Sequence, residues 1–151
     1  MAAGTEVELL TELLQTVAGH LGLEVTVEVV ERDGVLCGTL HGQELGLFIG
    51  RHGQTIDAVQ HLAQRAVATL VGEQRRVVVD AEGYRARRSE ALQAQADEAA
   101  DGALAAGQPV ALDAMTAGER RIVHEHLRER GDVATHSEGE EPDRHLVVSP
   151  A

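Results

Sequence analysis

Apolar residues in the first half of the chain recur with two periods, one typical of helices and one typical of strands. Residues 6–21 place leucine and valine three or four positions apart, which predicts an amphipathic helix that stops at Gly22. Residues 24–31 alternate valine with polar residues, and residues 35–40 resume a strand pattern after an Asp-Gly pair at 33–34. Because this pair favours a tight turn, the pattern predicts a hairpin of two strands.

Glycine interrupts the next apolar stretch. Residues 43–49 predict one or two helical turns, and the Gly-Arg-His-Gly sequence at 50–53 breaks them. Helical spacing of apolar residues resumes over 54–70 and ends at Gly72, and three consecutive valines within 75–80 predict a third strand. The expected order is helix, strand, strand, helix, helix, strand.

The sequence changes character after residue 80, which places a domain junction near residue 82. Residues 84–106 are rich in alanine, arginine, glutamate and glutamine and contain few large apolar residues. This composition favours a long helix, which Gly107 closes, and residues 109–113 then predict a short strand.

A further helix is expected to begin at a capping box, with Thr116 as the N-cap and Glu119 as the third helical residue. The helix should run to about residue 130 and bury three apolar side chains, those of Ile122, Val123 and Leu127. Residues 132–137 and 145–149 predict two more strands, joined by a polar turn.

Composition excludes several classes of function. Aromatic residues make up 1% of the chain, only Phe48 and Tyr84, which argues against folds that stack bases on surface aromatics. All 13 basic residues are arginine, so neither a phosphate-binding P-loop nor a Schiff-base enzyme, both of which need lysine, is expected.

The N-terminal sequence and hydropathy predict neither a signal peptide nor a membrane span, and the lone Cys37 predicts no internal disulfide. We therefore expect a cytoplasmic protein with no membrane insertion.

The net charge of −12 is distributed unevenly. Residues 48–88 hold seven arginines against four acids, and residues 116–130 hold four arginines against three acids, whereas the rest of the chain is acidic. An acidic protein attracts nucleic acid weakly at long range, but arginines and backbone N–H groups that converge locally can still hold an anion. The alternative is that both islands are solvated or ion-paired faces.

The Gly50-Arg51-His52-Gly53 loop is the first candidate for such an anion site. Glycine allows close approach, and N–H groups at the start of the following helix, together with its dipole, favour an anion. Arg51 and His52 add donors. A glycine pair at this spacing is common, so a plain connection between two helices is the alternative.

Arg120 and His124 are the second candidate, because residues four positions apart lie on one face of a helix. Arg120 lies near the positive end of the helix dipole, which an anion or an acid such as Glu119 would compensate. A structural pair is the alternative. His124 and His126 face different ways on a helix, so we expect no metal site. No nucleophile pattern is present, and we expect neither an enzyme, a cofactor nor a small-molecule substrate.

The order of elements around the glycine loop, with Ile49 directly before it, resembles a type II KH domain. The resemblance implies an α+β fold over residues 1–82, in which Gly50, Arg51, His52 and Gly53 contact phosphates. It also implies an aliphatic groove for bases, lined by Ile49, Ile56 and the second strand.

The chain from about residue 6 to residue 151 resembles the Jag family of SpoIIIJ-associated proteins, also called KhpB. The resemblance rests on three stretches of the sequence, at 80–88, 115–124 and 135–144. It implies an R-three-H domain, a small α/β domain that binds single-stranded nucleic acid, over residues 83–151. Arg120 and His124 become its phosphate-facing pair, and Arg144 is a third candidate. Many members carry a further N-terminal domain, whereas this sequence starts at the KH helix.

The function expected from this resemblance is binding of single-stranded RNA in post-transcriptional regulation and in control of cell elongation and division. An adaptor that pairs with a small KH-domain protein is the alternative, because the acidic flanks suit a protein partner better than RNA.

Overall fold

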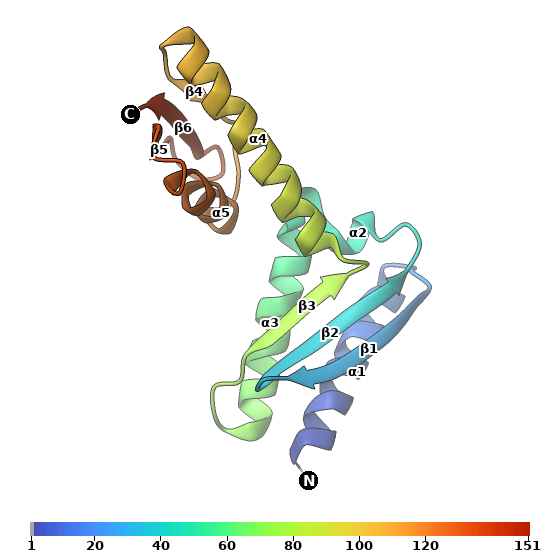
Figure 1. The fold of residues 1–151 in the computed structure, drawn as a ribbon. Coiled ribbons are helices and arrows are strands. Elements are labelled where there is room, and N and C mark those ends of the chain that lie inside the picture. Colours follow the sequence, from blue (N-terminus) through green and yellow to red (C-terminus); the bar gives the residue numbers. More distant parts are fainter. Residues whose placement is uncertain (1) are drawn as a thin grey trace. The chain divides into compact units, whose positions relative to one another are not determined.

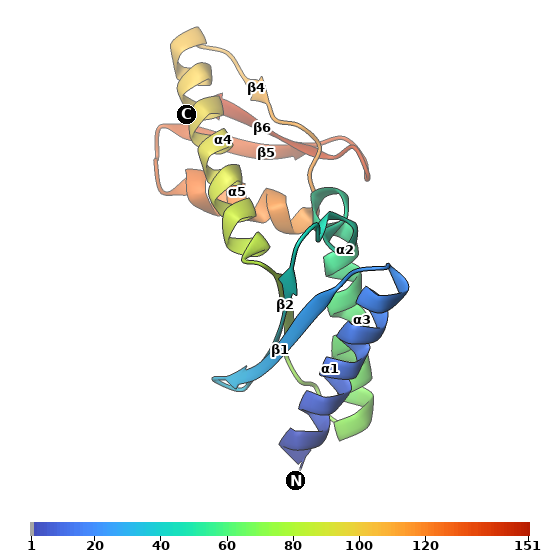
Figure 2. The ribbon, with the colours of Figure 1, turned by 90° about the vertical axis from the view of Figure 1, so that its right-hand side faces the viewer.

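The computed structural model describes residues 2–151, which form two compact units, Met1–Arg85 and Ala86–Ala151 (Figures 1 and 2). Each unit has its own sheet and its own hydrophobic core. The fold is mixed α and β, as predicted. Within residues 2–151, no helix is both long and apolar enough to cross a lipid bilayer.

The first unit contains the predicted order of elements. The two strands of the hairpin are antiparallel and the last strand runs parallel to the second, in the order β1-β2-β3. Asp33 and Gly34 both have positive φ, as the tight hairpin turn requires. The elements are α1 (Ala2–His20), β1 (Val25–Arg32), β2 (Val35–Gly42), α2 (Gly46–Ile49), η1 (Arg51–Gly53), α3 (Gln54–Val71) and β3 (Val77–Ala81).

Helices α1 and α3 cover one face of this sheet (Figure 1). Their apolar sides meet the inward residues of β2 and β3, and Phe48 of α2 is fully buried among them. The burial of alternate residues along β2 and β3 confirms the strand patterns in the sequence. This core fixes α2 and α3 on either side of the glycine loop.

The second unit is built on a long helix and an antiparallel sheet in the order β4-β6-β5. The predicted strand at 109–113 is only two residues long, and the helix that begins after Thr116 ends at Arg128. Ile122 is half-buried, not fully buried. The elements are α4 (Tyr84–Ala106), β4 (Val110–Ala111), α5 (Ala117–Arg128), β5 (Val133–Glu138) and β6 (His145–Pro150).

Small side chains explain why α4 looked weakly amphipathic in the sequence. Its buried positions include Leu92 and several alanines, which pack with Val123 and Leu127 of α5 within one core. Alanine lets neighbouring elements approach closely, and close packing supplies dispersion contacts that a count of large apolar residues misses.

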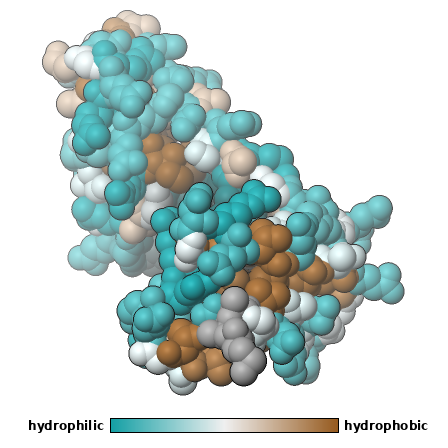
Figure 3. Space-filling view, turned by 60° about the horizontal axis from the view of Figure 1, so that its bottom comes forward, coloured by the Kyte–Doolittle hydropathy of each residue, from teal (hydrophilic) through white to brown (hydrophobic). Residues whose placement is uncertain are grey.

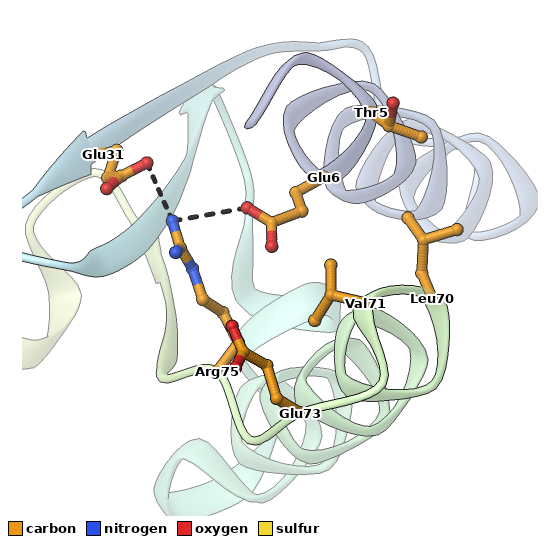
Figure 4. A pocket seen from close by; sticks show the side chains of 7 residues that line it. All are labelled: Thr5, Glu6, Glu31, Leu70, Val71, Glu73 and Arg75. Atoms are coloured by element: carbon orange, nitrogen blue, oxygen red, sulfur yellow. Dashed lines mark ion pairs between the residues drawn. The ribbon is translucent and has the colours of Figure 1, made fainter. Parts of the chain in front are cut away.

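A buried carboxylate lies at the end of the first unit where α1 begins and α3 ends. Glu6 on α1 is only 5% exposed, and Nη2 of Arg75 lies 3.3 Å from its carboxylate and 2.7 Å from that of Glu31. Figure 4 shows the guanidinium between the two carboxylates, in a pocket that Leu70 and Val71 also line. Neither approach has hydrogen-bond geometry, so the contact is an ion pair that neutralises a desolvated acid.

We expect Arg75→Met to lower the free energy of unfolding by about 3–5 kcal/mol, because it leaves the Glu6 carboxylate buried without a counter-charge. Urea unfolding of the full chain, followed by circular dichroism, measures the change. Arg76→Met is the matched control: Arg76 is the exposed neighbour, so its loss should cost less than about 1 kcal/mol. Equal effects of the two variants would contradict the role of Arg75.

Candidate nucleic-acid interface

The glycine loop of the first unit has a strained backbone that is fixed by its neighbours. Gly50, His52 and Gly53 have positive φ angles of 75°, 55° and 74°. A Cβ on Gly50 would collide with the side chain of Thr55, and a Cβ on Gly53 would lie 2.9 Å from Oη of Tyr84. The chain itself therefore requires glycine at both ends of the loop, and the loop conformation is set before any ligand arrives.

Some of the backbone N–H groups that the sequence suggested for binding an anion instead donate hydrogen bonds within the chain. The amides of Gly50 and Gly53 donate to Gly46 and Gly50, at 2.8 Å and 3.2 Å, and the amide of Gln54 donates to Arg51. The N-cap of α3 is Gly53, which has no side-chain oxygen to satisfy the first helical amides. The attraction of this site for an anion thus rests on the helix dipole and on Arg51.

The side chains around the loop differ in accessibility. Arg51 is exposed, whereas His52 and Ile49 are half-buried. Ile56 is fully buried in the core, as its apolar helical spacing predicts, and its role in lining a groove for bases stays a prediction. The apolar side chain that does reach solvent beside the loop is Leu47, which is 60% exposed and was not among the predicted site residues.

The start of α4 lies against the loop and against the first turn of α3. Tyr84 approaches Gly53, and Nη1 of Arg85 donates to Asp57 at 2.9 Å. Asp80 accepts from the backbone amide of Arg85 at 3.2 Å. Arg85 therefore adds a guanidinium next to the loop that sequence reasoning missed, because no local pattern connects residues 28 positions apart.

In the second unit, all three predicted site residues line one hollow of about 430 Å³ between α5 and the sheet. Arg120 and His124 come from α5 and Arg144 from the residue before β6, and Thr135 and Ser137 of β5 add hydroxyl groups. Arg121 and His136 complete its polar lining. The lining residues carry no carboxylate, so the hollow is a suitable place for an anion.

Arg120 is held firmly by the chain. Its side chain is 11% exposed; Nη1 donates to the carbonyl of Met115 at 2.9 Å and Nη2 donates to Glu141 at 2.7 Å. The hydrogen bond from Arg120 lowers the pKa of the Glu141 carboxyl below its usual range. Arg144, three residues after Glu141, donates to the carbonyl of Gly139.

At the N-terminus of α5, the negative charge that a helix dipole favours is supplied by Glu119 of the chain itself. The predicted capping box is present: Thr116 and Glu119 each accept from the other's backbone amide. The Glu119 carboxylate also accepts from Nε of Arg88 at 2.7 Å. The start of α5 is therefore closed to an external anion, in contrast to the start of α3.

The histidines of α5 have separate partners. His124 is exposed and contacts the hydroxyl of Thr135, whereas His126 contacts Asp97 at 3.0 Å. Across residues 2–151, no group of three or more histidine, cysteine or acidic side chains is arranged to hold a metal ion.

Comparison with known proteins matches both units. A model of the KhpA/KhpB KH domain matches residues 7–81, and a model of the R-three-H domain matches residues 90–150. The RNA-binding protein KhpB of Clostridium symbiosum is 36% identical over 132 residues, which cover 87% of this chain.

The chain belongs to the KhpB family.

Two more relatives extend the comparison. The RNA-binding protein KhpB of Bacillus subtilis is 36% identical over 90% of the chain, and that of Lactiplantibacillus plantarum is 34% identical over 96%. This KhpB-family chain spans 60%, 66% and 45% of the lengths of the three relatives, in the order given.

We expect Gly50→Ala to lower the free energy of unfolding of the KhpB-family chain by more than about 2 kcal/mol. It puts a Cβ at φ 75° and ψ 175°, a backbone region essentially restricted to glycine that costs another residue roughly 1–3 kcal/mol, and against Thr55. Gly46→Ala in α2 is the control, because open space surrounds Gly46 and alanine favours a helix. Thermal unfolding of both variants gives the comparison, and an unchanged midpoint for Gly50→Ala would show that the loop is not constrained as described.

Proposed function

We propose that this chain binds single-stranded RNA through two sites, one in each unit. The first is the loop of Gly50, Arg51, His52 and Gly53, with Ile49 beside it. The second is the hollow lined by Arg120, His124 and Arg144. The KH domain spans 1–82 and the R-three-H domain 83–151 in this proposal, which extends to post-transcriptional regulation and control of cell elongation and division, as the family resemblance implies.

The observation that carries the proposal is that the side chains of the second site come together in one hollow. Side chains that are up to 24 positions apart in the sequence line one hollow without a carboxylate, in a chain of net charge −12. Relatives named as RNA-binding proteins add support. A phosphate is the anion that suits this lining, because guanidinium, imidazole and hydroxyl groups all donate hydrogen bonds to phosphate oxygens.

The three residues at the second site have different roles in this proposal. Arg120 is largely buried and makes two hydrogen bonds within the chain, so it supplies charge and positions the Glu141 loop. His124 is exposed and Arg144 half-exposed, so they contact the phosphate. Each site offers few charges, and linking two weak sites can raise the overall affinity by about 10²–10⁴ when both engage.

Arg51→Asp should weaken binding of a labelled single-stranded RNA at low salt by about tenfold or more, because it replaces a donor by a repelling charge. The slope of log K against log salt should fall in magnitude by about 0.7, the share of one phosphate contact on a single strand. Fluorescence anisotropy titrations at several salt concentrations measure both quantities.

Arg32→Asp is the matched control for this test. It makes the same charge change on an exposed arginine at the hairpin, the other end of β2 from the loop. The control should alter affinity only slightly. Equal weakening by the two variants would reduce the effect of Arg51 to net charge and remove the loop from the proposal.

Glu141→Gln should strengthen RNA binding several-fold, because the Glu141 carboxylate neutralises the charge that Arg120 supplies to the hollow. Glutamine keeps an oxygen that accepts from Nη2, so the position of Arg120 is preserved. Glu140→Gln, which removes the same charge from the preceding exposed residue, is the control. The same titration compares them, and affinity gains of equal size would exclude a specific effect of Glu141 on Arg120.

A protein contact is a second candidate function, favoured by exposed leucines on α3. Leu62 is 56% exposed and Leu70 is 47% exposed, eight positions apart on one helix. Apolar surface also reaches solvent at the end of the first unit where α1 begins and α3 ends (Figure 3). A small KH-domain protein is the partner we propose for this face. Its retention on the purified chain after nuclease treatment, without bound RNA, would favour the adaptor function.

A further inference from the structure

The sheet of the first unit has one face that the helices of this unit leave open. α1 and α3 pack on the other face, where their apolar sides meet the inward residues of the strands (Figures 1 and 2). Because successive side chains of a strand point to opposite faces, every second residue lies on the open face, and these residues are exposed or only partly buried. The open face consists of Thr26, Glu28, Val30, Arg32, Val35, Cys37, Thr39, His41, Arg76, Val78 and Asp80.

The edge of the sheet at β3 is closed, in contrast to this face. The amide of Val79 donates to Oε1 of Gln60 at 3.0 Å, and the amide of Val77 donates to Oε1 of Gln64 at 3.4 Å. The carbonyl of Val79 accepts from Nε of Arg85 at 2.8 Å. These side chains occupy the backbone groups that a further strand would need, so another chain is excluded from this edge and not from the open face.

The strand register arranges the side chains of the open face in three parallel rows. Successive rows are two residues apart along the strands, or about 7 Å. The middle row is apolar, and the rows on its two sides are basic and acidic. The basic row is Arg32, Val35 and Arg76, the apolar row is Val30, Cys37 and Val78, and the acidic row is Glu28, Thr39 and Asp80. Opposite charges thus lie on opposite sides of an apolar centre.

The charged groups of the two flanking rows are available to a partner. Within residues 2–151, no ion pair involves Arg32 or Arg76, and both are exposed. The Glu28 side chain is 58% exposed and contacts His41 through Oε2 at 3.2 Å, which leaves Oε1. Asp80 accepts from two backbone amides through Oδ1, which leaves Oδ2.

We propose that the open face pairs with the open face of a second copy of this chain in a two-fold dimer. The row pattern is self-complementary about an axis that runs along the apolar row, perpendicular to the strands. Half a turn about this axis reverses the strand direction, so each basic row meets the acidic row of the other copy and the apolar rows meet each other. Arg32 then faces the partner's Glu28, Arg76 faces the partner's Asp80, and Cys37 faces the partner's Cys37. An axis along the strands would instead place arginine on arginine.

The size of the open face predicts a weak dimer. Three strands and three rows cover roughly 300 Å² on each copy, well below the roughly 800 Å² per partner of a stable complex. Ion pairs at the rim of an interface contribute little affinity but select the orientation. We expect a dissociation constant of about 0.1–1 mM, so the dilute chain is a monomer, and the variants of Arg32 and Arg76 above are compared as monomers.

The first test is sedimentation equilibrium of the full chain up to millimolar concentration, with alkylation of Cys37 as a second readout. Cys37 is the only cysteine, and it lies at the centre of the proposed contact. Its reaction with iodoacetamide should slow as the chain concentration rises through the dissociation constant. A wild type that stays monomeric would overturn the inference. A dimer in which Cys37 reacts at an unchanged rate would do the same, because it would form through another surface.

An exchange of charges on β1 tests the orientation. Arg32→Glu and Glu28→Arg each place like charges opposite each other in the dimer, so each should weaken self-association by about tenfold or more. A mixture of the two variants should associate as the wild type does, because every acid then faces an arginine of the other copy. Arg32 and Glu28 are four residues apart on one strand, about 13 Å, so they do not pair within one copy. Both variants stay strongly acidic, so net charge does not bring them together.

Glu8→Arg is the matched control for Glu28→Arg. It makes the same charge change at an exposed acid on α1, which covers the other face of the sheet. It should self-associate as the wild type does, and it should not restore association to Arg32→Glu. Circular dichroism confirms that each variant is folded. A mixture of Arg32→Glu and Glu28→Arg that stays monomeric, or equal rescue by Glu8→Arg, would overturn the proposed pairing. The proposed RNA binding is unaffected by either result, because the dimer uses neither RNA site.

Discussion

Competition between the chain's own carboxylates and any ligand for a small set of guanidinium groups governs where this protein can hold an anion. The chain has 25 acids and 13 arginines, and many arginines are already engaged: Arg75, Arg85, Arg88, Arg120, Arg121 and Arg130 all form ion pairs. Within residues 2–151, the structure gives no ion pair to Arg51 or Arg144. These two arginines lie at the two proposed sites, where their charge is not neutralised by an ion pair within the chain and adds to the local positive potential.

Sequence rules predicted the turns and caps that depend on neighbouring residues. They did not predict contacts between residues that are far apart in the sequence. The Asp-Gly hairpin and the capping box of Thr116 and Glu119 appeared as expected, because each is settled within four residues. The partner of Glu141 could not be predicted from its neighbours, because the fold brings Arg120 to it from 21 positions away. Local chemistry indicated the glycine loop and the pair of Arg120 and His124 as candidates, the family resemblance added Ile49 and Arg144, and the roles of all of them stay predictions.

Glycine in the loop has a different meaning in the structure from the one its spacing suggested. The spacing indicated room for an approaching ligand, whereas the structure fills that room with Thr55 and Tyr84. The loop is therefore preorganised by the chain's own packing, which reduces the conformational entropy lost on binding. A weak electrostatic site benefits most from such preorganisation, since the few donors it has are already in place.

The edge of β3 must be protected from pairing with other strands without weakening the attraction of the nearby loop for phosphate. An open edge would pair with other chains, and a charged residue placed there to prevent this would change the attraction of the site for phosphate. Gln60 and Gln64 close the edge without charge, and Arg85 closes the carbonyl side with a charge of the sign that nucleic acid favours. The strand is therefore protected against edge-to-edge pairing without an added carboxylate that would repel an anion at the neighbouring loop.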